Sequence, residues 1–452
     1  MRATAADPPA PRSGGRLTTL RLAAATYFLV AGGPYGLEEL VQAGGYARAA
    51  LLILVTPILF SLPTALMVGE LASSIPEEGG YYVWVKRALG PFAGFVEAWL
   101  SLCASFFDMA IYPTLFVTYL ARALPGADEG ASRVGLGMAM IALCTAYNLR
   151  GARSVGSAAL LFSAALLGPF LVLSLFALGA APSPGPPSGG SEGGLGAGLL
   201  VAMWNFMGWD NASTFAGEVE RPQRTYPRAM LLAVLAVVIT YIVPVLAASR
   251  SGMAPSEWST GSWVTAGERV GGPWLGRAVV LGGMLCGAGM FNALLLSYSR
   301  VPAALAEDGL LPKVFARTNE RGVPVVSVVA CSALYGAGLL LSFRKLVELD
   351  LLFYGTALIL EFVALLVLRV KEPNLERPFR VPGGTPIAAL LGVFPGLLFA
   401  VGLYAELAGG GSQAPTAIAA CASLGVGALV WFARRRGAPP KAGPGSLAAR
   451  AP

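Results

Sequence analysis

Two stretches of the chain interrupt otherwise apolar sequence and decide the fold: AGGPYGLEE at residues 31–39 and WNFMGWDNASTFAGEVE at residues 204–220. The first holds three glycines and a proline, and in the second Gly208 is followed by Trp209, Asp210 and Asn211. Glycine and proline both disrupt helical continuity. We therefore expect two helices that are each broken near the middle, with carboxylic acids beside each break.

The composition indicates an integral membrane protein. Of 452 residues, 55% are hydrophobic and 13% are charged, and the mean hydropathy is +0.66. Soluble proteins are about 25% charged, so this composition argues against a soluble enzyme, a disordered chain and a nucleic-acid binder. Histidine is absent, which excludes histidine-based catalysis and imidazole metal ligands. The five cysteines lie in apolar stretches without CxxC spacing and are expected to be buried, without disulfides or zinc.

A helix needs about 20 apolar residues to cross a bilayer, and twelve segments of the chain are suitable. They lie near residues 20–43, 48–74, 92–121, 134–149, 155–180, 196–217, 229–249, 276–299, 324–342, 346–368, 386–407 and 415–433. The polar N-terminal tail has no apolar core of a cleaved signal peptide, so the first segment is expected to insert as a span. The sequence therefore predicts an all-α integral membrane protein with twelve transmembrane helices.

The Lys and Arg residues predict the orientation, because cytoplasmic loops are enriched in them. With the N-terminus inside, 24 of the 32 basic residues fall in cytoplasmic segments and eight in outer segments. Both termini are therefore expected in the cytoplasm, and short tails rich in Ala, Gly and Arg favour a bacterial cytoplasmic membrane. The net charge of +7 is explained by this topology and does not indicate nucleic-acid binding.

A segment rich in Pro, Gly and Ser, PSPGPPSGGSEGG at 182–194, is expected to be a flexible extracytoplasmic linker. It separates the first five predicted spans from the next five, as expected for two five-helix repeats followed by two further helices. The predicted organisation is a cytoplasmic tail at 1–19, a first repeat at 20–180, the linker at 181–195, a second repeat at 196–369, two further helices at 370–434 and a cytoplasmic tail at 435–452.

The broken helices are the first and the sixth predicted spans, and this spacing indicates a binding site between them. Transporters often bind substrate between helices that are broken at corresponding positions of two repeats. The alternative is that these glycines mark ordinary kinks at close helix crossings. Two breaks at this separation, each beside acids, favour the site.

Several carboxylic acids lie inside or next to apolar segments, where an ionisable group indicates function. They are Glu38, Glu39, Asp108 and Asp210. No Lys or Arg lies deep in a predicted span, so these acids are expected either to be protonated or to meet a cationic substrate, unless they are solvated at the interface. Glutamates nearer the ends of predicted spans are expected to be solvated. These are Glu70, Glu97, Glu218 and Glu361.

Seven stretches resemble the amino acid–polyamine–organocation superfamily, in order, along nearly the whole chain. They are GGPYGLEE (32–39), ELASSIPEEGGYYVWVKRALGPFAGF (70–95), FFDMAIYPTLFVTYL (106–120), NLRGARSVG (148–156), WDNASTFAGEVERPQRTYPRAM (209–230), AEDGLLPKVFA (306–316) and RPFRVPGGT (377–385). Each alone is weak, but their order and spacing are highly specific. The likeness is strongest to polyamine uptake transporters of plants and protozoa and their bacterial relatives, in a branch that also resembles L-type amino acid transporters.

The resemblance implies the leucine-transporter type of fold, with two inverted five-helix repeats, discontinuous first and sixth helices and alternating access. It also implies that 76–89 is a short amphipathic cytoplasmic segment below the site. The substrate-binding residues that it implies are Gly32, Gly33, Tyr35, Glu38, Asp108, Tyr112, Asn205, Trp209 and Asp210. Candidates for binding a coupling proton or sodium ion are Glu38, Asp210, Ser297 and Ser299. Serines in apolar helices also bond to their own backbone, which is the alternative for the last two.

These residues favour a substrate with cationic amino groups. In relatives that carry amino acids, N–H groups of the broken first helix hold the substrate carboxylate, but Pro34 has no N–H to give. The nearby acids repel a carboxylate and attract ammonium. Against this, plant members carry a further glutamate in the eighth helix where this chain has Leu294, which favours putrescine, an aminoacyl derivative or an amino acid. Aromatic residues that either face a cation or simply pack are Tyr35, Tyr112, Trp204 and Trp209.

The sequence therefore predicts a secondary active transporter of polyamines or related cations, with proton coupling, sodium coupling and substrate exchange all open. An amino acid permease or exchanger of the same superfamily is the alternative. A transporter-like nutrient sensor is less favoured, because such sensors carry larger cytoplasmic domains. Neither an enzyme nor a channel is expected, because there is no nucleophile or metal constellation and only one asymmetric pair of broken helices. The expected partners are a small-molecule substrate and the lipid bilayer, with no cofactor, metal or nucleic acid, and no Walker motif for ATP hydrolysis is present.

Overall fold

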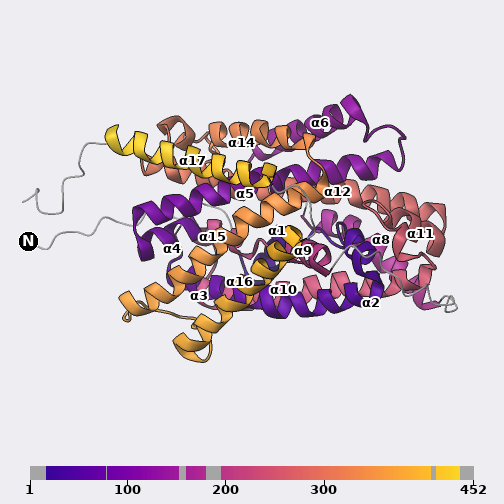
Figure 1. Cartoon of the computed structure of the whole chain (residues 1–452), viewed down its shortest axis with the longest axis horizontal. Helices are drawn as coiled ribbons and strands as arrows, with labels where there is room; N and C mark the ends of the chain where they lie inside the picture. Colours follow the sequence, from indigo (N-terminus) through magenta and orange to yellow (C-terminus); the bar gives the residue numbers. More distant parts are fainter. Residues whose placement is uncertain (1–16, 78, 152–158, 180–194, 409–413, 438–452) are drawn as a thin grey trace, which may run out of the picture.

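The computed structural model describes residues 17–77, 79–151, 159–179, 195–408 and 414–437. Over these ranges the chain is helical, and its only β pairings are two isolated bridges. Most helices run along the long axis of the molecule, with α1 (Thr19–Val30) and α9 (Leu195–Asn205) near its middle (Figure 1). The predicted all-α fold is confirmed, whereas the predicted linker at 181–195 lies almost wholly outside the described residues.

The other helices follow in chain order. They are α2 (Glu38–Thr56), the π-helix η1 (Pro57–Ser61), α3 (Leu62–Ser74), α4 (Gly80–Leu89), α5 (Pro91–Ala121), α6 (Gly130–Asn148), α8 (Ala159–Gly179), the 3-10 helix η2 (Trp209–Glu218), α10 (Pro222–Ala248), η3 (Ser249–Ser251), η4 (Pro255–Glu257), α11 (Trp263–Gly271), α12 (Pro273–Tyr298), α13 (Arg300–Glu307), η5 (Lys313–Ala316), α14 (Val325–Ala337), η6 (Gly338–Leu340), α15 (Phe343–Lys371), α16 (Gly384–Ala408) and α17 (Ala414–Gly437).

Among the described residues, six helical stretches are long and apolar enough to cross a membrane. They are Glu38–Ser74, Pro91–Ala121, Pro222–Ser251, Pro273–Glu307, Phe343–Lys371 and Gly384–Val401. Shorter apolar helices accompany them, and the described part of each predicted span is helical apart from residues 31–37, residues 206–208 and a few residues at span ends. Large apolar side chains are exposed along one side of α10, which suits contact with lipid. They are Leu231, Leu232, Leu235, Ile239, Val243 and Leu246.

The first break separates α1 from α2. Helix α1 ends at Val30, and residues 31–37 form turns before α2 begins. Gly33 and Gly36 have φ angles of 73° and 97°, which side chains rarely allow. Helix α2 is kinked at Gly45, where φ is 71°, between the first two predicted spans. The first predicted span is thus broken where its glycines and proline indicated.

The second break faces the first. Helix α9 ends at Asn205, and the chain resumes as η2 at Trp209. Gly208 has a φ of 91°, and a Cβ at this position would lie 3.0 Å from the carbonyl oxygen of Leu29 at the end of α1. A Cβ at Gly36 would in turn lie 2.8 Å from the ring of Trp204. Glycine therefore allows the two breaks to approach each other closely.

Short helices cover the two ends of the molecule. Helix α4 is the amphipathic segment that the resemblance implied, and its buried face includes Tyr81 and Trp84. Helices α11 and α13 were not expected, because they are amphipathic and, with nine and eight residues, too short to form an apolar span. Helices α4 and α11 lie toward opposite ends (Figure 1).

The expectation that glutamates near span ends are solvated was wrong for three of them. Glu70 and Glu97 are 0% exposed and Glu361 is 1% exposed. Helices α5 and α15 pack along each other, and α4 packs on both, so neighbouring helices cover positions that look terminal in sequence. The side chain of Glu218 lies outside the described residues.

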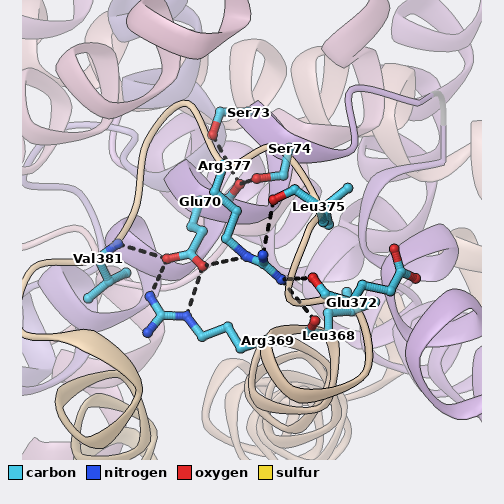
Figure 2. Close-up of polar contacts among 9 residues, drawn as sticks. All are labelled: Glu70, Ser73, Ser74, Leu368, Arg369, Glu372, Leu375, Arg377 and Val381. Atoms are coloured by element: carbon cyan, nitrogen blue, oxygen red, sulfur yellow. Dashed lines mark hydrogen bonds and ion pairs between the residues drawn. The ribbon is translucent and has the colours of Figure 1, made fainter.

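Two arginines neutralise Glu70 (Figure 2). Its Oε1 accepts a hydrogen bond from Arg369 Nε at 2.8 Å and lies 3.4 Å from Arg377 Nε. Its Oε2 accepts from the Val381 N–H at 2.7 Å and pairs with Arg369 Nη2. We call Glu70, Arg369, Arg377 and the Val381 amide the Glu70 cluster. It joins α3 to the last turn of α15 and to the segment that follows.

Candidate functional site

A pocket lies where the two breaks meet, between α1, α5, α9, α10 and α12. Its lining is formed by Leu29, Val30, Gly32, Tyr35, Asp108, Tyr112, Leu115, Trp204, Asn205, Met207, Gly208, Asn211, Tyr241, Cys286, Met290 and Tyr298. Within this described lining, Asp108 is the only acidic or basic residue. The pocket is otherwise aromatic, apolar or amide-bearing, as small-molecule sites usually are.

Asp108 receives hydrogen bonds from three neutral groups. Its Oδ1 accepts from the Tyr112 hydroxyl at 2.9 Å and from Trp204 Nε1 at 3.4 Å, and its Oδ2 accepts from the Tyr298 hydroxyl at 3.2 Å. The side chain is almost fully buried, and no basic residue of the described lining balances its charge. An ammonium group would supply both positive charge and N–H donors at this point, and the surrounding rings offer cation–π faces.

Glu38 lies at the start of α2, outside the pocket lining. Its Oε2 accepts from the Gly36 N–H at 2.7 Å, and its Oε1 accepts from the Gly261 N–H at 3.1 Å and from the Tyr119 hydroxyl. The carboxylate therefore ties the first break to α5 and to the segment before α11. Its neighbour Glu39 accepts from the Thr260 hydroxyl at 3.0 Å.

Asp210 lies at the start of η2, next to the lining residues Gly208 and Asn211. Its Oδ1 accepts from the Tyr354 hydroxyl at 2.6 Å. The same hydroxyl accepts from the Gly208 N–H at 3.0 Å. Tyr354 of α15 thus bridges the second break and its carboxylate.

The structure brings part of the expected substrate site together. Of the expected residues, those that line the pocket are Gly32, Tyr35, Asp108, Tyr112 and Asn205. Those that lie beside it, outside the lining, are Gly33, Glu38, Trp209 and Asp210. Trp209 is fully buried, and its indole N–H donates to the Phe206 carbonyl at 2.7 Å, which is a packing arrangement.

Helix α12 contributes residues that the sequence analysis did not identify. Cys286, Met290 and Tyr298 line the pocket at intervals of four and eight residues, so they share one helical face. A Cβ at Gly32 would lie 2.4 Å from Cys286 Sγ, so this face presses directly on the first break. The spacing of these residues in multiples of four is the feature of the sequence that could have placed them on one face of the helix. Leu294 belongs to the same series but is buried outside the lining.

The two serines proposed as sodium ligands lie on or just after α12. Ser297 Oγ donates to Asn211 Oδ1 at 3.2 Å and lies 3.1 Å from Thr214 Oγ1, so it contacts η2. Ser299 is buried after the end of the helix. No set of three Cys, Asp or Glu residues in the described ranges is placed to hold a metal ion.

Comparison with known proteins identifies the family. A sequence profile described as amino acid permease matches residues 17–428. A probable polyamine transporter of Arabidopsis thaliana is 36% identical over 399 residues, which cover 86% of this chain and 82% of that protein. Polyamine transporter PUT1 of Oryza sativa subsp. japonica is 35% identical over 402 residues, covering 87% and 74%. Branched-chain amino acid permease BcaP of Bacillus subtilis is 26% identical over 372 residues, covering 75% and 78%. The chain therefore belongs to the amino acid permease family of multi-pass membrane transporters.

Proposed function

We propose that this protein is a secondary active transporter that carries polyamines across the cytoplasmic membrane by alternating access. One observation carries the proposal: among the described residues that line the pocket between the broken helices, Asp108 is the only acidic or basic one, and its hydrogen-bond partners are all neutral. A buried carboxylate without a counter-ion is costly, so a cationic substrate is favoured there and a substrate carboxylate is not. Two of the relatives are named polyamine transporters.

The architecture that supports this function is the leucine-transporter type. In this proposal the chain crosses the membrane twelve times, with five-helix repeats at 20–180 and 196–369 and two additional helices. Helices α1 and α9 begin the two repeats, and both are broken. Both termini and α4 lie on the cytoplasmic side, and α11 lies on the outer side. Cysteine labelling at residues 182–194 should then occur from outside in intact cells, and labelling only after permeabilisation would contradict this orientation.

The residues divide into ligands and positioning groups. Asp108 binds an ammonium group, while Tyr35, Tyr112 and Asn205 of the lining contact the methylene chain or further donors. Gly32 and Gly33 keep the first break open to substrate, and Trp209 packs behind the second break. We assign Glu38 to positioning, because it lies outside the pocket lining and its carboxylate joins the first break to α5 and to the segment before α11.

The coupling ion is part of the proposal. A proton carried on Glu38 or Asp210 and a sodium ion bound near Ser297 and Ser299 are the two candidates. Asp210 is favoured as the proton carrier, because it lies at the second break and its carboxylate accepts from Tyr354, which also binds the Gly208 N–H. Dependence of uptake on an imposed proton or sodium gradient separates these candidates.

The decisive experiment is uptake into proteoliposomes of labelled putrescine, spermidine and spermine beside labelled leucine and arginine, with and without an inward proton gradient. Polyamine uptake that collapses with the gradient supports a proton-coupled polyamine transporter. Uptake of leucine without polyamine uptake would favour the alternative of an amino acid permease or exchanger, as the name of BcaP says of that relative. In that case Asp108 would not select cations.

A further inference from the structure

Two helices each carry a pair of buried carboxylates at the same spacing. Helix α5 carries Glu97 and Asp108, and α15 carries Asp350 and Glu361. Eleven residues separate the members of each pair, which is three turns, so each pair lies on one helical face and spans roughly 16 Å. Helices α5 and α15 pack against each other, and all four side chains are buried.

These acids form two levels. Asp108 interacts electrostatically with Asp350, and Glu97 interacts with Glu361. We call Asp108 and Asp350 the upper tier and Glu97 and Glu361 the lower tier. Asp210 interacts electrostatically with members of both tiers. A row of acids therefore leads from the pocket toward the end of the molecule where α4 lies.

Among the described residues, the lower tier has one hydrogen-bond partner, the Ser101 hydroxyl. Glu97 Oε2 and Glu361 Oε2 are buried without a hydrogen bond, and only the Ser101 hydroxyl reaches Glu97 Oε1, at 3.2 Å. No Lys or Arg in the described ranges pairs with either acid. The fully buried phenol of Tyr81, on α4, interacts with both tier members and with Asp210, yet its hydroxyl makes no hydrogen bond of standard geometry. Polar groups from three helices thus converge here, and three of their buried oxygens make no hydrogen bond of standard geometry.

The arrangement suits amine cations better than a metal ion. No three acidic groups of the described chain are close enough to hold a metal, whereas an ammonium group brings one charge and several N–H donors to separated carboxylates. A chain of single bonds extends by about 1.2 Å per bond, so the amines of putrescine lie roughly 6 Å apart and the end amines of spermine roughly 16 Å apart. The latter distance matches the spacing of the tiers.

We propose that Glu97 and Glu361 form a second ammonium subsite, which takes the far amine of a long polyamine while Asp108 holds the near amine. The inference rests on the proposed function and adds a basis for selecting substrate length. Helix α4 covers this subsite in the present conformation through Tyr81. The subsite becomes accessible to the polyamine when the side of the molecule covered by α4 opens.

The test compares spermine with putrescine in proteoliposomes that contain the full chain. Glu97→Gln combined with Glu361→Gln should raise the KM for spermine by about tenfold and leave the KM for putrescine within about twofold, because only the long substrate reaches the lower tier. Glu97→Asp and Glu361→Asp keep the charge and should retain most of the spermine affinity. Glu348→Gln is the matched control, since this glutamate also lies on α15 but pairs with Arg344 and Lys345.

Three outcomes overturn the inference. An equal loss for spermine and putrescine would mean that the lower tier supports the fold or transport in general, and a thermal melt of each variant identifies a folding defect. No change for either substrate would remove the subsite while leaving the proposed function intact. Absence of any polyamine uptake by the unmodified protein would overturn both the function and the subsite.

Discussion

The Glu70 cluster and the lower tier differ in whether the protein itself supplies a positive charge to the buried carboxylates. Glu70, Glu97 and Glu361 are all at most 1% exposed. Glu70 is held by two arginines and a backbone amide (Figure 2), whereas the lower tier has no cation among the described residues and retains two unpartnered oxygens. A buried charge needs compensation. Where the protein provides it, the acid is structural, and where it does not, a mobile cation or a proton must provide it.

Position in the sequence does not distinguish the compensated acid Glu70 from the uncompensated acids of the lower tier. All three acids lie in apolar segments: Glu70 and Glu97 are four and six residues from a helix end, and Glu361 is ten residues from the end of α15. What differs is the neighbouring segment: the end of α15 brings Arg369, and the segment after it brings Arg377. The comparison therefore predicts that the same substitution, Glu to Gln, has different consequences in the two regions.

The largest effect is expected at Glu70. Glu70→Gln leaves Arg369 and Arg377 without their carboxylate and should cost about 3–5 kcal/mol of stability, as breaking a buried ion pair does. The thermal unfolding temperature and monodispersity in detergent measure this. Glu372→Gln is the control, because its ion pair with Arg87 is exposed to solvent and worth at most about 1 kcal/mol. Equal melting temperatures for the two variants would contradict the assignment of Glu70 as a structural acid held by a buried ion pair.

A large functional effect is expected at Asp108 in the upper tier. Asp108→Asn should raise the KM for putrescine about 10- to 100-fold, the range for losing a charge-assisted hydrogen bond. Folding should survive, because the amide oxygen can still accept from Tyr112 and Trp204, and the amide N–H can donate to the Tyr298 hydroxyl oxygen. Initial uptake rates give the KM, with Asp128→Asn on the exposed surface as control. An unchanged KM would show that the pocket acid does not bind the amine.

A smaller effect, of opposite sign to that at Glu70, is expected for the stability of the lower tier. Combining Glu97→Gln with Glu361→Gln removes two uncompensated buried acids. The free energy of unfolding should stay unchanged or rise by up to about 1 kcal/mol, and the melting temperature should follow it. Measurement without polyamine is essential, since a bound polyamine would itself stabilise the native protein. A fall as large as that of Glu70→Gln would mean that an internal partner neutralises these acids.

The smallest effect concerns pH at the exposed pair of Arg87 and Glu372. Arg87 donates to both carboxylate oxygens and holds the pKa of Glu372 below its usual range. The pair therefore contributes stability above the ordinary glutamate pKa of about 4.3, and this contribution is lost as pH falls through the lowered value. The melting difference between the parent protein and Glu372→Gln should be small at neutral pH and vanish in acid. A melting-temperature difference that does not change with pH would mean that packing, and not the ion pair, causes it.

Local sequence patterns were sufficient for much of the fold and part of the site. Apolar length predicted the helices, because a bilayer requires long apolar segments. The glycines at 33, 36 and 208 adopt φ angles that other residues rarely allow, so both breaks could be placed from residue type alone. Asp108 was identified because an acid within an apolar segment is unusual. Asp350 lies within the predicted span at 346–368 and was not identified from the sequence.

The sequence by itself determined that this is a helical membrane protein with two broken helices and an acid at mid-helix, since these properties depend on local composition and backbone freedom. Only the tertiary structure decided which acids are neutralised. Glu70 meets Arg369 from 299 positions away, Glu38 is occupied by Tyr119 and Gly261, and Glu361 meets no cation among the described residues. The physical reason is that burial and charge compensation depend on which distant helices pack together, and no local pattern encodes that contact.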